Sequence, residues 1–390
     1  MNIFLFLSLV FLFTFLLGRL MERIRVPWIF SALIIGALLS LFNPFSSVTS
    51  SSTFDFLANM GMYFLLFIIG FEIDLNELKK KSRFILKTTF FIILLEALFG
   101  SMLIHFIFGY EWIISFLVAL SFATVGEAVL IPILDEFKAT NTKLGQTTIG
   151  IGMMDDIIEV ALLVLVIITI GSQSHGHMNA LIALGSLFTL FVLTVGFTKF
   201  REKGKRFSVF NLESTFLFVI FILFFFLGIG MFAEATSLAA LLAGIGVKTF
   251  IPRKRLRSIE SEVKAVCYGF FAPIFFLWAG LGMDLYSLIT SPLLVVSLVI
   301  VTSAGKILGS YASTRKYLGG RGSILLGIGL SVRFSTSIVI MKILLKNGII
   351  GTELYSMVVA SSILFMFIVP VVFSNLLVKW GTGRGKANNI

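Results

Sequence analysis

The sequence contains few charged residues and a single cysteine, and each scarcity excludes a class of protein. Asp, Glu, Lys and Arg together make up 13% of the 390 residues, which is too little to give a soluble domain its polar surface. The one cysteine, Cys267, excludes both an internal disulfide framework and a cysteine-based metal site. We therefore expect no small disulfide-linked domain and no separate soluble domain.

Apolar runs fill the chain instead. The sequence is 58% hydrophobic, with a mean hydropathy of +1.04, and a membrane-spanning helix needs ~20 mostly apolar residues. These runs predict an all-α polytopic membrane protein that forms one membrane domain over residues 1–390. The expected spans, about thirteen, are 3–18, 28–42, 54–71, 84–108, 112–134, 145–171, 179–198, 212–232, 235–249, 263–283, 290–313, 322–345 and 354–378.

The distribution of basic residues predicts the orientation of these spans. The net charge is +11, and almost all basic residues fall in the odd-numbered loops and the C-terminal tail, whereas Lys346 is the only one in an even-numbered loop. Because Lys and Arg favour the cytoplasmic side, we expect the N-terminus outside and the C-terminus in the cytoplasm, in an inner (plasma) membrane. The charge is thus explained by topology and does not indicate a nucleic-acid partner.

An internal repeat appears at an offset of 210 residues. It aligns FLLFIIGFEIDL (64–75) with IFFLWAGLGMDL (274–285), and by the charge count the two segments have opposite orientations. Inverted repeats are typical of secondary transporters, whose ion sites lie near the midplane between discontinuous helices. The same offset aligns SFATVGEAV (121–129) with SVRFSTSIV (331–339). We expect two crossed discontinuous helices there, although small residues of this kind also permit close helix packing.

Charged residues inside the spans predict a functional layer. Asp155 and Asp156 lie about ten residues into their span, ~15 Å deep in a ~30 Å core, where a charge costs at least ~2.5 kcal/mol. Glu159 lies four residues after Asp155, on the same helix face. At comparable depth we expect Lys306, Arg333 and the segment from Thr124 to Glu127. The alternative is a network of ion pairs that only locks the bundle together.

The residue types in this layer suit a monovalent cation. Na⁺ prefers carboxylate, hydroxyl and carbonyl oxygens, so the proposed ligands are Asp156, Asp155 and Thr124. Coupling would follow if cations and protons compete for the same acids, while a lysine pairs with a carboxylate in the absence of the cation. The offset also aligns Glu96 with Lys306. For Glu96 we consider pairing with Arg333, pairing with Lys87, or no role.

Several stretches resemble the monovalent cation/proton antiporter-2 family over nearly the full length of the chain. They are GFEIDL near Gly70, MMDDII around Asp155, FFAPIFFLWAGLGMDL near Pro273, SAGKILG around Lys306 and GIGLSVRFS around Arg333. The adjacent aspartates make the chain more similar to the two-aspartate NapA-type Na⁺/H⁺ antiporters than to the Kef-type potassium efflux systems. About ten residues follow the last span, so the nucleotide-binding domain of many Kef-type relatives is not expected.

The resemblance implies a fold and roles for individual residues. The fold would be NhaA/NapA-like, with core helices at approximately 54–171 and 263–378, dimerisation helices at approximately 1–42 and 179–249, and an elevator-like movement in a homodimer. Asp156 would be the principal carboxylate, and Asp155 would pair with Lys306. Exchange would be electrogenic, with two protons per cation.

One departure from the family pattern concerns Arg333. The family's Pro-Arg-Gly-Glu stretch here reads Val332 to Ser335, so the acid after Arg333 is missing, and we expect Glu127 to replace it. Glu127 and Glu159 are acids that the pattern does not require, and they bear on ion selectivity.

We therefore predict an Na⁺ (or Li⁺)/H⁺ antiporter without a resident cofactor. A K⁺/H⁺ antiporter and an uncoupled channel or membrane sensor are the alternatives. An enzyme is not expected, because no nucleophile and base pair or metal-ligand cluster occurs in the charged layer.

Overall fold

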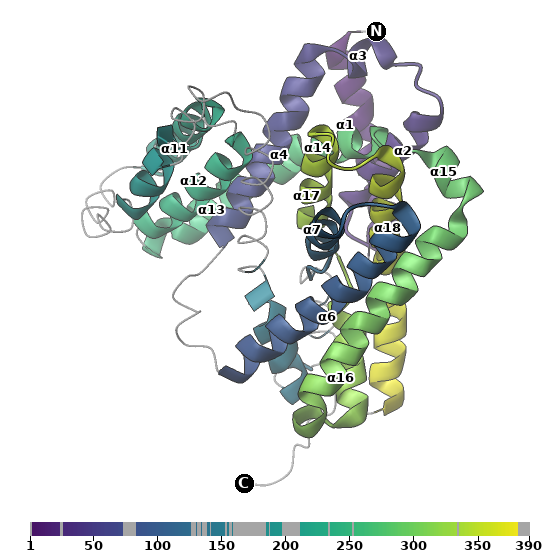
Figure 1. Ribbon diagram of the computed structural model, residues 1–390. Helices are drawn as coiled ribbons and strands as arrows, with labels where there is room; N and C mark the ends of the chain where they lie inside the picture. Colours follow the sequence, from purple (N-terminus) through teal and green to yellow (C-terminus); the bar gives the residue numbers. More distant parts are fainter. Residues whose placement is uncertain are drawn as a thin grey trace. The chain divides into compact units, whose positions relative to one another are not determined.

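The computed structural model describes residues 2–23, 26–72, 83–125, 130, 134, 139–140, 142–152, 154–155, 158, 185–186, 188–196, 211–232, 235–251, 253–333 and 335–380. Within these ranges all regular secondary structure is helical (Figure 1). The helices long and apolar enough to cross a membrane are α1 (Ile3–Arg23), α4 (Ser52–Glu72), α6 (Arg83–Phe108), α11 (Leu212–Phe232), the stretch Ser258–Leu281, α16 (Pro292–Leu330) and α18 (Thr352–Trp380). The predicted all-α polytopic class is confirmed.

Shorter helices are described as well, and residues 143–152 and 188–196 are also helical. Three of them are apolar, namely α2 (Phe30–Leu41), α7 (Trp112–Phe122) and α12 (Thr236–Phe250). The stretch Ser258–Leu281 combines most of α13 (Arg253–Val266) with a π-helical turn, η2 (Cys267–Phe271), and α14 (Ala272–Leu281). The others are α3 (Ser46–Thr49), α15 (Leu285–Thr290) and α17 (Ser335–Lys346).

Several predicted spans coincide with helices of the structure. The prediction of 212–232 matches α11 at both ends, and those of 54–71 and 84–108 lie within α4 and α6. The span predicted at 145–171 falls largely outside the described residues, whereas the described residues of the span predicted at 179–198, namely 185–186 and 188–196, are helical. The agreement reflects how strongly long apolar runs indicate spanning helices.

The region after residue 290 differs from the prediction in one detail. We expected one span to end at 313 and the next to begin at 322; the first helical stretch of α16 runs past 313 to a kink at Gly319, where φ is +73°, and a second stretch follows. Glycine adopts this left-handed conformation without a Cβ clash. The helix then runs on to Leu330.

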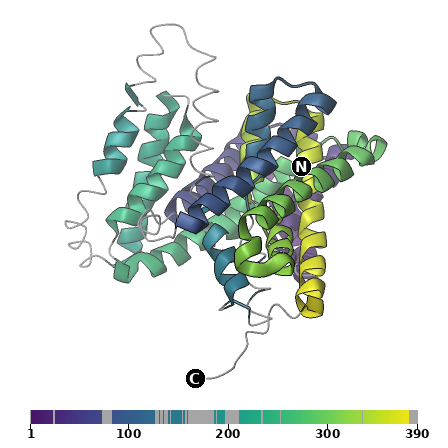
Figure 2. The same ribbon diagram turned by 60° about the horizontal axis from the view of Figure 1, so that its bottom comes forward.

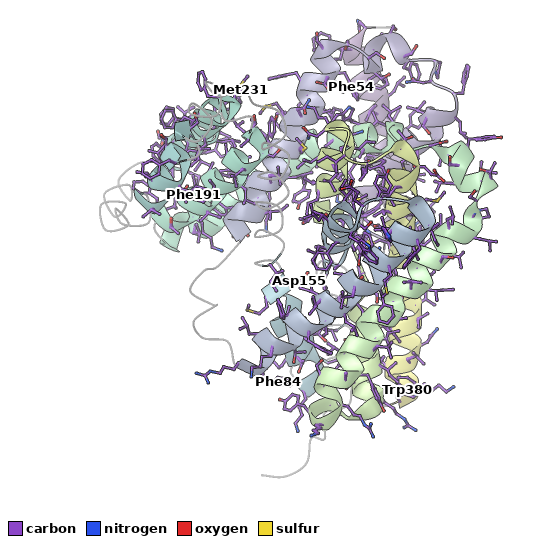
Figure 3. The ribbon with its side chains drawn as sticks, viewed as in Figure 1. Phe54, Phe84, Asp155, Phe191, Met231 and Trp380 are labelled. Atoms are coloured by element: carbon purple, nitrogen blue, oxygen red, sulfur yellow. The ribbon has the colours of Figure 1, made fainter. Side chains whose placement is uncertain are left out.

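The described helices divide into two compact units. The first comprises the described residues of Met1–Thr14, Asn43–Asp74 and Leu163–Trp278. In this unit α4 crosses α12 at very short range, because a Cβ on Gly70 would overlap the carbonyl oxygen of Leu241 and one on Gly244 would overlap that of Phe67. Exposed apolar side chains such as Met231 suit a lipid environment (Figure 3).

The second unit comprises the described residues of Phe15–Phe42, Leu75–Leu162 and Ala279–Ile390. Its main feature is the pairing of α6 with α16, which lie side by side in two views (Figures 1 and 2). A Cβ on Gly305 would come within 2.8 Å of the Cα of Glu96, so the two backbones touch at this point. α18 packs against α16 as well.

Packing in the second unit also supports the repeat. A Cβ on Gly280 would overlap the carbonyl oxygen of Leu33 in α2, just as its repeat counterpart Gly70 meets α12 in the first unit. The two glycines that the 210-residue offset aligns therefore serve the same purpose. Each allows another helix to approach the backbone.

The expected division into core and dimerisation helices stays a prediction. The two units follow from packing among the described helices, and their bounds differ from the ranges that the family resemblance implies.

Candidate ion site at two interrupted helices

Two interruptions of helical structure define the candidate site, and both fall in the segments that the repeat predicted. α7 ends at Phe122 and is followed by Ala123–Val125, which are not helical. α16 ends at Leu330, and after Ser331–Arg333 helical structure resumes as α17 at Ser335. Thr124, Ser331 and Arg333 are all buried. Backbone that leaves the helix at membrane depth must find other polar partners.

The partners of the first interruption are specific. In a continuous helix the N–H of Val125 would donate to the carbonyl oxygen of Ser121. Here the Val125 N–H donates to Oδ2 of Asp155 at 2.6 Å, and the Ser121 carbonyl accepts a hydrogen bond from Oγ of Ser337 at 3.1 Å. Two hydrogen bonds to side chains of other segments have thus replaced one hydrogen bond within the helix. Oγ1 of Thr124 lies 2.9 Å from Oγ of Ser337 and links the two interrupted segments.

Lys306 joins the ends of two helices. Its Nζ donates to the carbonyl oxygen of Thr124 at 3.0 Å and to that of Leu330 at 2.6 Å. It also lies 3.3 Å from Oε2 of Glu96. The two hydrogen bonds use two of the three donors of the ammonium group, and the contact with Glu96 is an ion pair. They put a positive charge at two helix C-termini, where carbonyl dipoles favour a cation.

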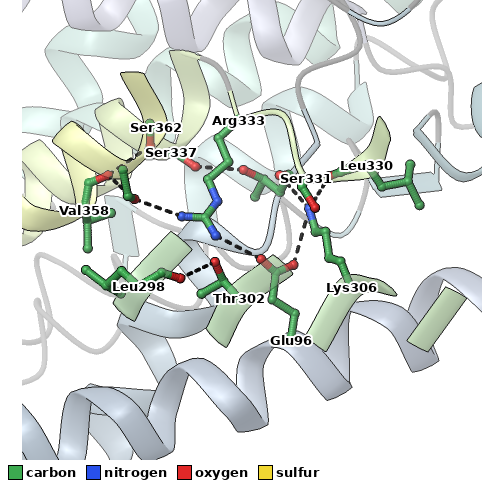
Figure 4. Close-up of polar contacts among 12 residues, drawn as sticks. Glu96, Leu298, Thr302, Lys306, Leu330, Ser331, Arg333, Ser337, Val358 and Ser362 are labelled. Atoms are coloured by element: carbon green, nitrogen blue, oxygen red, sulfur yellow. Dashed lines mark hydrogen bonds and ion pairs between the residues drawn. The ribbon is translucent and has the colours of Figure 1, made fainter. Parts of the chain in front are cut away.

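Arg333 is fully buried and held on several sides (Figure 4). Its NH2 lies 3.1 Å from Oε1 of Glu96, and its NH1 donates to Oγ of Ser361 at 3.2 Å. The guanidinium carbon lies 4.7 Å from the ring centre of Phe122 and 4.6 Å from that of Phe365, which is cation–π distance.

Glu96 is therefore the carboxylate that both buried cations share. Of the interpretations considered from the sequence, pairing with Arg333 is confirmed. The second pairing, with Lys306, was missed, although the 210-residue offset had already aligned these two residues. Among the described residues, Lys306 pairs with this acid in place of Asp155, the expected partner. The close approach of α6 to α16 at Gly305 accounts for it.

Asp155 binds backbone instead. Its side chain is 1% exposed, and it accepts the Val125 N–H bond described above. It lies away from the end of the unit that carries Phe84 and Trp380 (Figure 3). The other predicted site residues, Asp156, Glu127 and Glu159, lie outside the described residues, so the expected pairing of Glu127 with Arg333 stays a prediction.

The described part of the layer balances its charges and offers oxygen ligands. Glu96 and Asp155 carry two negative charges and Lys306 and Arg333 two positive ones when all four are ionised. Thr124 lies in the interrupted turn, and the carboxylate of Asp155 binds the N–H of the next residue, Val125. Such oxygen donors suit a hard cation.

Comparison with known proteins identifies a family and relatives of this chain. The family described as "Sodium/hydrogen exchanger, transmembrane" matches residues 9–379. A protein of Methanocaldococcus jannaschii named probable Na⁺/H⁺ antiporter 3 is 26% identical over 384 residues, which cover 96% of both chains. An Na⁺/H⁺ antiporter of Enterococcus hirae is 24% identical over 396 residues, covering 98% of both.

Two further similarities bear on fold and ion. The sodium proton antiporter MjNhaP1 from M. jannaschii superimposes with a TM-score of 0.69 over 95% of this chain and 98% of that one, at 15% identity. This shows that the fold is shared. The K⁺/H⁺ antiporter subunit KhtU of Bacillus subtilis is 26% identical over 314 residues, or 78% of this chain and 75% of that protein.

Proposed function

The chain belongs to the sodium/hydrogen exchanger family, and on this premise we propose that it is a secondary active antiporter that exchanges Na⁺, or Li⁺, for protons. Two relatives that match almost end to end are named Na⁺/H⁺ antiporters, and these proteins are transporters, not enzymes. The observation that carries the proposal is the interrupted turn of α7, with its buried Asp155 and Thr124. The cation and the proton are cargo, and the mechanism invokes no resident cofactor.

In the proposed cycle Na⁺ and protons compete for Asp155 and Asp156, and Thr124 adds a hydroxyl ligand. Asp156 is the principal carboxylate. Support comes from Asp155, which is buried beside backbone that has left the helix. A carboxylate at this depth without a proton or cation is costly, so only occupied sites would cross the membrane readily.

Lys306 has a different role in this proposal from the one that the sequence suggested. Its ammonium group donates to two helix ends and forms an ion pair with Glu96, so we assign it as a fixed cation that holds the interrupted helices together. Together with Glu96 and Arg333, Lys306 forms a group of charges that does not exchange ions in the proposed cycle. Glu127 and Glu159 are proposed as additional acids near the pathway.

The charge count then connects stoichiometry to electrogenicity. Glu96, Asp155, Lys306 and Arg333 sum to zero when ionised, and Asp156 adds one negative charge. One Na⁺ would neutralise the site, whereas two protons on the aspartate pair would leave it with one positive charge. Exchange of two protons for one Na⁺ would therefore move net charge in each cycle, and we propose this electrogenic mode.

Other features of the proposal follow from the family resemblance. We place the chain in the two-aspartate NapA-type branch, as a homodimer with an elevator-like core movement. The distribution of basic residues supports an inner-membrane location with the C-terminus in the cytoplasm. Under the usual inward proton gradient the antiporter would export the cation.

Everted membrane vesicles test the central claim. We expect Na⁺ and Li⁺ to dissipate a respiration-driven proton gradient and Asp156→Asn to abolish this response. Asp55→Asn, at an exposed aspartate in the first turn of α4, is the matched control and should retain it. A response to K⁺ alone would establish the K⁺/H⁺ alternative, which the similarity to KhtU makes worth testing. No response to any cation would overturn antiport in favour of a channel or sensor.

Current measurement on solid-supported membranes tests the stoichiometry. Two-for-one exchange predicts a transient current when Na⁺ is added to proteoliposomes, and one-for-one exchange predicts none. Lys306→Gln should retain a current if Lys306 is only a fixed charge.

A further inference from the structure

Ser337 has no part in the site that the sequence predicted, yet it contacts both halves of the interrupted turn. Its side chain is 1% exposed, in the first turn of α17. We propose that Ser337 is a positioning residue, which fixes the proton of the Thr124 hydroxyl so that the Thr124 oxygen is left free to accept a cation. This inference rests on the proposed function, because it assigns Ser337 to the same ion site.

The direction of the hydrogen bonds follows from the number of protons available. A serine hydroxyl has a single proton to donate. The carbonyl oxygen of Ser121 can only accept, and its helical donor, the Val125 N–H, is bonded to Asp155. The Ser337 proton therefore satisfies the Ser121 carbonyl at 3.1 Å. A buried carbonyl without a donor would cost free energy comparable to a lost hydrogen bond.

The direction of the hydrogen bond between Thr124 and Ser337 follows from this assignment. With the Ser337 proton committed to Ser121, the Thr124 hydroxyl must donate across the 2.9 Å contact. The lone pairs of the Thr124 oxygen stay available as acceptors, because no described residue donates a hydrogen bond to them. Thr124 thus presents a pure acceptor beside the turn that binds Asp155, which is the arrangement that a dehydrated cation needs.

The repeat explains why this serine is available. Ser337 comes from the segment at 331–339 and Thr124 from its counterpart at 121–129, so each interrupted helix supplies one hydroxyl. The two hydroxyls and the carbonyl form an ordered chain, Thr124 to Ser337 to Ser121. Ordering of the polar groups before the ion arrives lowers the cost of binding.

Isosteric variants separate the hydroxyl of Ser337 from its volume. Ser337→Thr and Ser337→Val have the same shape, and only the former can receive the Thr124 proton. We expect Ser337→Val to raise the apparent KM for Na⁺ about tenfold, the effect of one hydrogen bond in a charged site, with little change in maximal rate. Ser337→Thr should stay close to wild type. If neither β-branched residue folds, Ser337→Ala serves in place of Val.

A double-mutant cycle tests whether Ser337 acts through Thr124. If it does, Thr124→Val should weaken cation affinity, and adding Ser337→Val should weaken it little further. Both readouts are to be measured, namely KM in vesicles and the thermal stabilisation of purified protein by Na⁺, Li⁺ or K⁺. Ser101→Ala, at a buried serine of α6 that donates to Leu98 of its own helix, is the matched control.

The outcomes separate this inference from the proposed function. Additive effects in the cycle, or equal KM values for the Thr and Val variants, would overturn the positioning role while exchange itself stands. If the wild-type protein neither exchanges nor is stabilised by any of the three cations, both the function and the inference are overturned.

Discussion

The clearest quantitative prediction concerns Glu96, the acid that Lys306 and Arg333 share. Glu96→Gln keeps the shape and one acceptor oxygen but removes the negative charge. Both cations are fully buried, and among the described residues no other carboxylate lies within ion-pair distance of them. The variant would leave two buried positive charges without this counter-ion.

The expected cost follows from buried ion pairs elsewhere. Removing one partner of such a pair costs ~3–5 kcal/mol, because an uncompensated charge stays in a medium of low dielectric constant. With an unfolding entropy of ~2.1 cal/mol/K per residue, a chain of 390 residues loses roughly 4–6 °C of Tm. The contribution of Glu96 to stability should thus be visible in a simple thermal assay.

The assay is size-exclusion chromatography of a fluorescent fusion after heating in detergent. Glu260→Gln is the matched control, because Glu260 pairs with Lys264 at 2.8 Å while both side chains are about one-third exposed. Exposed pairs contribute ~0.5 kcal/mol, which corresponds to under ~1 °C here. The same chemical change should therefore have very different effects at the two positions.

A second variant sharpens the test of Glu96. Lys306→Gln combined with Glu96→Gln removes one of the stranded cations and should recover part of the lost Tm. If Glu96→Gln unfolds at the wild-type temperature, or shifts Tm no more than Glu260→Gln, the buried counter-ion reasoning is wrong.

Further predictions concern glycines and a helix cap. Gly305→Ala puts a Cβ 2.8 Å from the Cα of Glu96 in α6 and should cost ~1–3 kcal/mol of stability. In the matched control Gly320→Ala, the new Cβ meets only the ring of Tyr311 at 3.5 Å, and the wild-type Tm should be kept. Gly70→Ala should lower the yield of folded protein because α4 and α12 must separate, while Gly228→Ala, with open space in α11, should gain ~0.5–1 kcal/mol. Hydrogen bonds from the hydroxyl and N–H of Ser287, in the first turn of α15, lower the pKa of Asp284. Asp284→Asn removes the negative charge at this helix N-terminus and should cost ~0.5 kcal/mol at neutral pH. The difference should shrink as pH falls through that lowered pKa. Thermal unfolding in detergent, over a pH series for Asp284, measures all of these.

The sequence predicted the interruptions of the helices better than the contacts around them. Ser, Thr and Gly inside an otherwise apolar run are local signals, and they located the ends of α7 and α16 to within a few residues. Depth in the membrane is also a local quantity, since it follows from the count of residues along a helix. For this reason Thr124, Lys306 and Arg333 were expected in one layer, and the described structure brings them together.

The pairing of charges within the layer could not be obtained in the same way. The sequence places several acids and two cations at similar expected depth, and the pairs that form depend on how closely particular helices approach. The decisive residue is Gly305, which carries no charge and therefore gave no functional signal. By bringing α16 against the α6 backbone at Glu96, it gives Lys306 a partner other than Asp155. The contribution of Ser337 depends likewise on a contact across 213 residues of sequence.

The repeat nevertheless carries information about one of these pairs. In an inverted repeat, equivalent residues are related by a local two-fold axis, and where equivalent helices cross at that axis the equivalent residues face each other. Glu96 and Lys306 are equivalent at the 210-residue offset, and they form an ion pair. Gly61 and Phe271 have the same separation in the first unit, where a Cβ on Gly61 would lie 2.6 Å from the Phe271 carbonyl oxygen. Opposite charges at equivalent positions of such a repeat therefore predict an ion pair at the axis from the sequence alone.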